Sequence, residues 1–191
     1  VQARATDAAG KTSAIETTTI KMDATAPTVT VAGIADGAEL DVSAVRTARV
    51  AVSDATSGAA REVVRLDGKV VDAPVRLDAM SLRPGRHLLE VTAVDEAGNQ
   101  ASRTVRFRVL APTHGKARKL VDRLDDEGAV GPRLATKLKK ELKAAKQAER
   151  RKDVREALRS LKRFSKLAER VDDKEVRLAL KRLSRTLKSQ L

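Results

Sequence analysis

Few side chains in this chain could take part in catalysis. The 191 residues include no cysteine and two histidines, His87 at the start of an expected strand and His114 in an expected linker. A serine or threonine nucleophile needs a base that a third group holds in place, and neither histidine stands in such a pattern. The motifs of serine hydrolases, phosphate-binding loops and zinc proteases are also absent from the sequence. We therefore predict a region that catalyses no reaction.

Oxygen-rich turns point to a second kind of chemistry, calcium binding, because Ca²⁺ takes roughly six to eight oxygen ligands. Residues 54–57 and 95–99 form two such turns, and a further aspartate lies at an expected domain junction. The alternative is that these side chains accept hydrogen bonds from turn amides without a metal, since no EF-hand spacing is present. The candidate calcium ligands are Asp23, Asp95, Glu96 and Asn99.

Basic side chains follow three expected helices at spacings that place each series on one face of its helix. The series are Lys139, Lys143, Lys146 and Arg150; Arg155, Arg159, Lys162 and Lys166; and Lys174, Arg177, Lys181, Arg185 and Lys188. Such stripes attract polyanions with an affinity that falls as the salt concentration rises. The alternative is a solvated helix surface that binds nothing.

The charge of the chain is distributed unevenly. Residues 1–112 hold 14 Lys/Arg and 14 Asp/Glu, whereas residues 113–191 hold 25 and 12. For the basic part we expect an anionic cell-wall polymer or an acidic polysaccharide as the partner. A lipid surface ranks second, because the apolar helix faces are needed for a core. Nucleic acid ranks last, because no recognition-helix module is evident and the chain has no Trp or Tyr for stacking on bases or sugars.

The stretch 89–109, LEVTAVDEAGNQASRTVRFRV, organises the first part of the chain. Apolar and polar residues alternate on both sides of its centre, which is typical of two strands with one buried face. The segment Asp95-Glu96-Ala97-Gly98-Asn99 between them favours a tight turn. The stretch therefore predicts a β-hairpin.

A similar pattern occupies the beginning of the chain. Asp7-Ala8-Ala9-Gly10-Lys11 precedes the turn at 95–99 by 88 positions, which is about the length of one sandwich domain. We therefore expect residues 1–23 to be the last hairpin of a preceding domain of the same kind. The chain would then be part of a longer protein, with covalently linked domains upstream.

About seven short strands separated by turns between residues 24 and 110 predict a β-sandwich. Four motifs in it resemble those of bacterial immunoglobulin-like domains: Asp23-Ala24-Thr25-Ala26-Pro27, Asp54 with Ser57-Gly58, Leu82-Arg83-Pro84-Gly85-Arg86-His87, and Ala93-Val94 leading into the turn at 95–99. The resemblance implies an immunoglobulin-like fold of the kind found in secreted or surface-anchored proteins. It implies no single activity, because such domains serve spacing, adhesion and accessory roles.

A helical period replaces the alternation after a linker expected at residues 111–115. Gly128, Gly131-Pro132 and the pairs Asp153/Glu156 and Asp172/Glu175 mark helix ends and starts. Four amphipathic helices with short connections predict a compact antiparallel bundle over residues 116–191. The expected fold class is therefore multidomain: an all-β immunoglobulin-like sandwich followed by a small all-α helical bundle.

The order of these helices over residues 114–191 resembles the FIMAH-type domains that close many secreted actinobacterial proteins. The naming motif falls on Phe164-Ser165-Lys166-Leu167-Ala168, where the phenylalanine alone matches. The sequence contains no run of 18 apolar residues, which is about the length needed to span a membrane. We expect a secreted or cell-surface bacterial protein.

We expect this chain to be a non-catalytic C-terminal region, with an immunoglobulin-like spacer and a basic helical cap or docking module. One alternative is a polyanion-binding module that localises an upstream hydrolase. Another is nucleic-acid binding through the basic helices.

Overall fold

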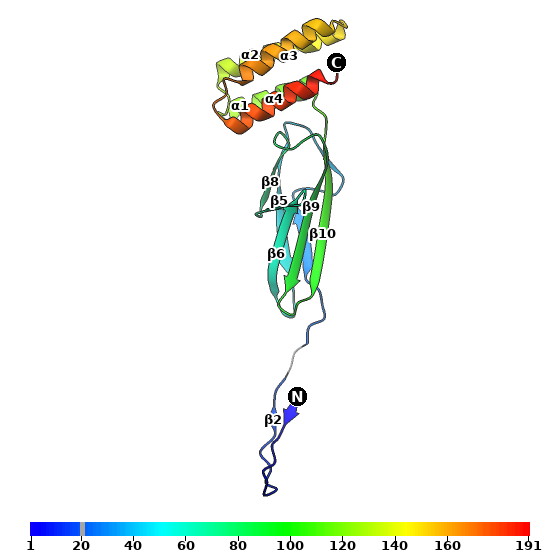
Figure 1. Cartoon of the computed structure of the whole chain (residues 1–191), viewed down its shortest axis with the longest axis vertical. Helices are drawn as coiled ribbons and strands as arrows, with labels where there is room; N and C mark the ends of the chain where they lie inside the picture. The colour runs from blue at the N-terminus through cyan, green and yellow to red at the C-terminus, as the bar shows by residue number, and fades with distance from the viewer. Residues whose placement is uncertain (20–21) are drawn as a thin grey trace.

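The computed structural model describes residues 1–19 and 22–191, which form three parts in a row along one long axis (Figure 1). A small hairpin stands at the N-terminal end, a β-sandwich lies in the middle, and four helices form the other end. The hairpin predicted for residues 1–23 includes positions 20 and 21, which lie outside the described residues.

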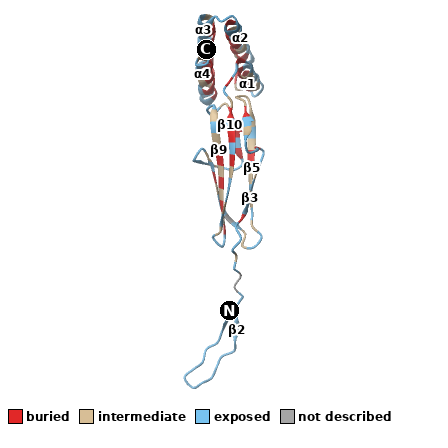
Figure 2. Cartoon of the chain, turned by 90° about the vertical axis from the view of Figure 1, so that its right-hand side faces the viewer, coloured by how far each residue is buried: buried red, intermediate tan, exposed pale blue. Residues whose placement is uncertain are grey.

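The N-terminal hairpin consists of β1 (Gln2–Ala3) and β2 (Glu16–Thr17), which pair antiparallel. In its turn, Oδ1 of Asp7 accepts hydrogen bonds from the amides of Ala9 and Lys11, as the turn residues predicted. Residues 1–19 are exposed throughout, and the hairpin projects away from the sandwich (Figure 2).

The sandwich consists of a five-stranded sheet with the order β4-β10-β9-β6-β7 and a three-stranded sheet with the order β3-β5-β8. The strands are β3 (Thr28–Ala32), β4 (Ala38–Leu40), β5 (Val45–Ser53), β6 (Ala59–Leu66), β7 (Lys69–Val71), β8 (Val75–Asp78), β9 (Gly85–Asp95) and β10 (Gln100–Val109). The pair β4 and β10 is parallel, and the other described pairs are antiparallel. This arrangement confirms the predicted all-β, immunoglobulin-like fold class.

The long strands β9 and β10 supply the centre of the sandwich core. Their buried residues include Leu89, Val91, Val105 and Phe107, each at most 3% exposed. Burial of side chains of this size contributes about 1.5–3 kcal/mol each. Gly98 completes the turn with a φ of +93°, a conformation that glycine adopts without steric cost. The strongest pattern in the sequence therefore corresponds to the central hairpin of the fold.

The helices are α1 (His114–Asp126), α2 (Pro132–Arg150), α3 (Val154–Ala168) and α4 (Lys174–Lys188). The first begins at His114, inside the stretch expected to be a linker. Asp153 caps α3 as predicted, by accepting a hydrogen bond from the amide of Glu156. The cap of α4 is Asp173 rather than the predicted Asp172, because Asp173 is the residue that reaches the amide of Val176. Among the described residues, no helix combines the length and hydropathy needed to cross a membrane.

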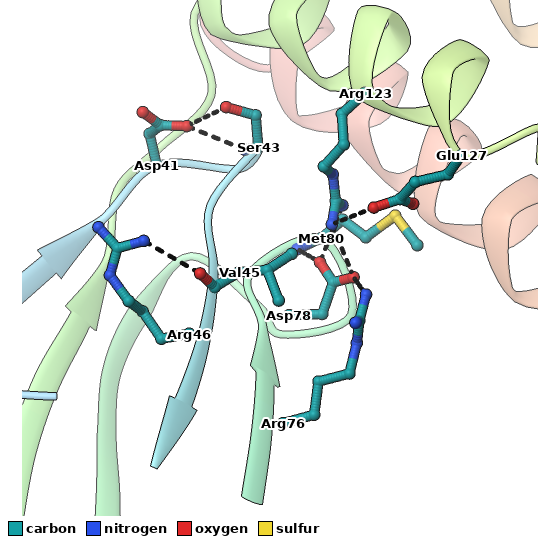
Figure 3. A network of polar contacts seen from close by, with 9 residues as sticks. All are labelled: Asp41, Ser43, Val45, Arg46, Arg76, Asp78, Met80, Arg123 and Glu127. Carbon is teal, nitrogen blue, oxygen red and sulfur yellow. Dashed lines mark hydrogen bonds and ion pairs between the residues drawn. The ribbon is translucent and has the colours of Figure 1, made fainter. Parts of the chain in front are cut away.

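An ion-pair network centred on Asp78, the last residue of β8, joins the sandwich to the helical bundle (Figure 3). Both carboxylate oxygens of Asp78 accept hydrogen bonds of 3.0 Å from the guanidinium of Arg123 on α1. The two side chains are only 12% and 15% exposed. Arg76 and the amide of Met80 also donate to this carboxylate, at 3.5 and 3.1 Å.

Further contacts surround this network. Lys116 of α1 donates to Asp41 at 2.7 Å. Burial acts to raise the pKa of Asp41, but hydrogen bonds from Lys116 and Ser43 outweigh it and lower this pKa to about 2. Arg182 of α4 donates to the carbonyl oxygen of Ser81 at 3.0 Å. Two helices are therefore tied to three different loops or strand ends of the sandwich.

Candidate metal centre and basic surfaces

Three aspartates gather at the end of the sandwich toward which β9 runs. Asp23 lies before β3, Asp54 follows β5, and Asp95 ends β9. One carboxylate oxygen from each lies within 4.8 Å of the other two. The loops meet because β6 pairs with β9, which places Ala59 opposite Asp95.

Hydrogen bonds within this acidic cluster occupy several of its oxygens. Oδ1 of Asp54 accepts hydrogen bonds from the amides of Gly58, Ser57 and Thr56 at 2.8–3.0 Å. These bonds lower the pKa of Asp54, and the carboxylate therefore stays ionised. The hydroxyl of Ser57 donates to Oδ2 of Asp23 at 2.5 Å.

Asn99 ties the β9–β10 turn to the segment that enters β3. Its amide and its Nδ2 donate to the two oxygens of Asp95, at 2.7 and 2.8 Å. The same Nδ2 lies within hydrogen-bond distance of the carbonyl oxygens of Asp23 and Thr25. The side-chain nitrogen of Asn99 therefore points toward its neighbours and donates hydrogen bonds to them.

The structure brings together two of the four predicted calcium ligands, Asp23 and Asp95, and adds Asp54 to them. Glu96 is exposed and lies outside the group of three, and its backbone amide donates to the carbonyl oxygen of Gly58. In the sequence, Asp54 and Asp95 belong to two separate turns. The register of β6 against β9 brings them together, and the local sequence pattern does not reveal that register. Three carboxylates would supply part of the roughly six to eight oxygens that Ca²⁺ takes, and turn amides already bond to the same groups.

The two histidines have structural contacts. The ring of His87 lies 2.7 Å from a carboxylate oxygen of Asp67 and 2.7 Å from the carbonyl oxygen of Arg83, and it stacks on Phe107. Nδ1 of His114, in the first turn of α1, lies 3.3 Å from the carboxylate of Glu149 on α2. His87 therefore packs within the sandwich, and His114 packs within the bundle.

A pH dependence follows from the burial of His114, which is 7% exposed. Burial lowers the pKa of its imidazole from 6.5, more than Glu149 raises it, and Lys146 lowers it further. As the pH falls below 6.5, the unfolded chain binds a proton that the folded chain resists. We expect the free energy of unfolding of the helical domain to fall with pH in this window. Urea titrations at pH 7.5 and 5.5 should show a smaller fall in His114→Gln, and an equal fall would contradict the argument.

The thirteen predicted basic residues lie along α2, α3 and α4. Four of them have partners: Lys139, Arg159 and Lys181 pair with carboxylates, and Arg177 donates to a carbonyl oxygen. The other nine make no side-chain ion pair or hydrogen bond within residues 1–19 and 22–191: Lys143, Lys146, Arg150, Arg155, Lys162, Lys166, Lys174, Arg185 and Lys188. The helical surface therefore retains unpaired positive charge.

The sequence analysis missed a second group of cations, on the sandwich. Arg86 on β9 and Arg106 and Arg108 on β10 lie side by side on the five-stranded sheet. The balanced total charge of residues 1–112 concealed them. Two arginines at alternate positions of one expected strand, 106 and 108, and one near the start of the partner strand, 86, were the signal that could have identified this group.

Residues 115–189 match the FIMAH domain family. This match confirms the resemblance predicted for the helical domain, and it covers less than half of the chain. No curated protein sequence matches the chain. A sandwich joined to a FIMAH domain is consistent with a non-catalytic accessory region.

Several solved structures are similar to less than half of this chain. They include fibronectin(III)-like modules of Clostridium thermocellum CbhA, with 18% identity over 44% of this chain and 97% of that chain and a TM-score of 0.35. The PKD1 domain of Vibrio anguillarum Epp shows 17% identity over 46% and 98%, with a TM-score of 0.35. An endo-beta-1,4-mannanase from Thermotoga petrophila shows 16% identity over 46% of this chain and 20% of that chain, with a TM-score of 0.36.

Proposed function

We propose that this chain is a non-catalytic accessory region of an exported bacterial protein, in which the sandwich is a spacer that holds the helical domain in one orientation. The observation that supports this proposal most directly is the paired hydrogen bonding of Asp78 with Arg123 across the junction. Export is supported by the immunoglobulin-like motifs, because domains with such motifs occur in secreted or surface-anchored proteins. The hairpin within residues 1–19 adds support, because it resembles the last hairpin of a second domain of this kind.

The chemistry of the junction favours one orientation over a hinge. Two parallel N–H···O bonds between a guanidinium and a carboxylate fix direction as well as distance. Lys116 and Arg182 add contacts from two different helices. Val42 and Met80 of the sandwich also pack against the apolar core of the bundle. Rotation about any one of these contacts would break the others.

A pulsed electron resonance experiment tests this rigidity. The chain contains no cysteine, so spin labels attach only at introduced positions such as Lys69→Cys on the sandwich and Arg151→Cys beyond α2, both exposed. We expect a single narrow distance distribution in the full chain. Adding Asp78→Ala should broaden it, because the central pair is lost. A broad distribution in the intact chain would contradict the proposal.

A second candidate function is docking to an anionic polymer through the helical domain, which would place an upstream hydrolase at the cell wall. The nine unpaired basic side chains of α2, α3 and α4 favour it. Salt-sensitive retention of the full chain on wall polymer is the expected result, and retention that salt does not change would remove this candidate.

A further inference from the structure

The outer face of the five-stranded sheet carries a cluster of three arginines. Arg86 lies directly opposite Arg108 in the β9–β10 ladder, and Arg106 lies two residues before Arg108 on the same strand. Their Cα atoms are therefore about 5–8 Å apart. All three are exposed, and within the described part of the chain their side chains form no ion pair or hydrogen bond.

A hollow of about 510 Å³ lies over these arginines. Leu88 also lines it, and Glu39 and Asp67 are its two carboxylates. Asp67 is already engaged, because its oxygens bind the ring of His87 and the amide of Leu88 at 2.7 and 3.0 Å. The hollow therefore presents excess positive charge beside a small apolar surface.

Arg108 lies between Arg86 of β9 and Glu39 of β4, so Glu39 offsets part of the repulsion that Arg86 and Arg108 exert on each other. Like charges directly across an antiparallel pair repel, at a cost of a few tenths to about 1 kcal/mol. Local conflicts of this kind are expected where a surface serves a ligand rather than the fold. An anionic group between the two guanidiniums would remove the repulsion.

A second hollow of about 510 Å³ lies at the junction with the bundle, where Arg83, Arg182 and Arg185 line it together with Pro84 and Thr186. The two hollows share no lining residue, but Arg83 of the second lies only three residues before Arg86 of the first in the chain. In Figure 1 the five-stranded sheet and α4 both lie toward the viewer, and in Figure 2 β9 and α4 lie on the same side. The strand and the helix that contribute to the two hollows, β9 and α4, therefore lie on the same side of the molecule.

We propose that these hollows form one binding surface for an acidic polysaccharide, and that six arginines contact its anionic groups. This arginine strip consists of Arg83, Arg86, Arg106, Arg108, Arg182 and Arg185. Guanidiniums bind carboxylate, sulfate and phosphate groups through paired hydrogen bonds. A strip that runs from the sheet to α4 fits an extended chain with an anion on successive units better than it fits a single small anion.

Other anionic partners fit the arginine strip less well. A protein interface usually has an apolar, often aromatic centre, and an anionic lipid surface needs inserted apolar side chains. None of the large exposed apolar residues of the described chain lines either hollow. Single-stranded nucleic acid binds through aromatic stacking, and the two rings among the residues of the first hollow are almost covered, with Phe107 3% exposed and the His87 side chain 8% exposed. A sugar chain needs only the cations and a short apolar contact such as Leu88.

The second hollow depends on the domain orientation proposed above, whereas the first lies wholly within the sandwich. Substitutions in the two hollows therefore distinguish a failure of the arginine-strip proposal from a failure of the proposed domain orientation. If the junction were flexible, Arg86→Gln/Arg108→Gln would still weaken binding, and Arg83→Gln/Arg185→Gln would have little effect. If the arginine strip did not bind the polymer, neither pair of substitutions would weaken binding more than the loss of two positive charges elsewhere on the surface.

The test measures binding of the full chain to polygalacturonate, dextran sulfate and polyphosphate, with neutral dextran and a DNA duplex for comparison. We expect binding to at least one anionic sugar polymer and none to dextran. Arg86→Gln/Arg108→Gln should weaken it by about tenfold, and the charge-matched pair Arg118→Gln/Lys119→Gln, exposed on α1 and outside both hollows, by less than about twofold. Arg86→Lys/Arg108→Lys should also weaken it several-fold, because lysine keeps the charge but loses the paired geometry.

Several results would overturn the proposal. Equal losses in the sheet pair and the α1 pair would mean that binding follows net charge. Full binding in the arginine-to-lysine variant would mean that no paired contact forms. Tighter binding to the DNA duplex or to polyphosphate than to either sugar polymer would assign the surface to another partner. Thermal denaturation of each variant checks the fold, and Arg86→Gln/Arg108→Gln should change the stability by less than about 1 kcal/mol, because it removes both the repulsion between the arginines and the attraction of Arg108 to Glu39.

Discussion

Truncation of Phe164 to alanine is expected to lower the free energy of unfolding of the helical domain by about 3–5 kcal/mol. Phe164 on α3 is fully buried, in a core that also contains Leu142 of α2 and Leu180 of α4. The truncation would leave a cavity between helices that cannot all move inward together. Urea denaturation of the full chain, followed by the helical signal in circular dichroism, measures the loss.

Leu158→Ala is the matched control on the same helix. This side chain is 40% exposed, so its truncation should change the unfolding free energy by less than about 1 kcal/mol. A loss as large as that of Phe164→Ala would mean that α3 turns a different face toward the core. Helical spacing alone does not separate the two residues, because both border the apolar stripe; packing of α2 and α4 against α3 decides which of them is covered.

The elements that sequence predicted best are those in which one local pattern determines the structure. The alternation on both sides of the turn at 95–99 requires two strands with one buried face, and β9 and β10 pair along ten successive positions. The Gly131-Pro132 step similarly marks the start of α2. These signals need no information from distant residues, which explains why they were sufficient.

The candidate sites were harder to predict because they depend on contacts between distant segments. Asp54 and Asp95 belong to turns 41 positions apart in sequence, and the β6–β9 register brings them together. Arg86 and Arg108 become neighbours through the β9–β10 register. A count of total charge cannot detect that pair, because carboxylates elsewhere in residues 1–112 balance it.

The junction between the domains shows the same limit. Asp78 was not distinguished in the sequence from other aspartates that end strands, and Arg123 looked like one more basic helix residue. Their bidentate pair exists because α1 begins at His114, which leaves a short connection after β10 and lays the helix across the ends of the sheets (Figure 1). The basic helices thus use part of their charge inside the protein.

Asp78→Ala is expected to lower the free energy of unfolding of the helical domain by about 2–4 kcal/mol. The change removes both bonds to Arg123, which is 15% exposed, and leaves a largely buried guanidinium without its main partner. Glu127 lies 3.6 Å from Arg123 but is more exposed, and it can compensate only in part. In urea denaturation, the midpoint for unfolding of the helices should move to a lower urea concentration. The midpoint for unfolding of the sandwich should move less.

Asp72→Ala supplies the control, since Asp72 is exposed on the same sandwich and pairs with no described cation. Its effect should stay within about 0.5 kcal/mol. The double variant Asp78→Ala/Arg123→Met should recover part of the loss, because the charge left unpaired by Asp78→Ala is then gone and an apolar side chain of similar reach replaces it. If Asp78→Ala cost no more than Asp72→Ala, the pair would contribute little to the junction, and the apolar contacts of Val42 and Met80 with the bundle core would have to account for the orientation of the two domains.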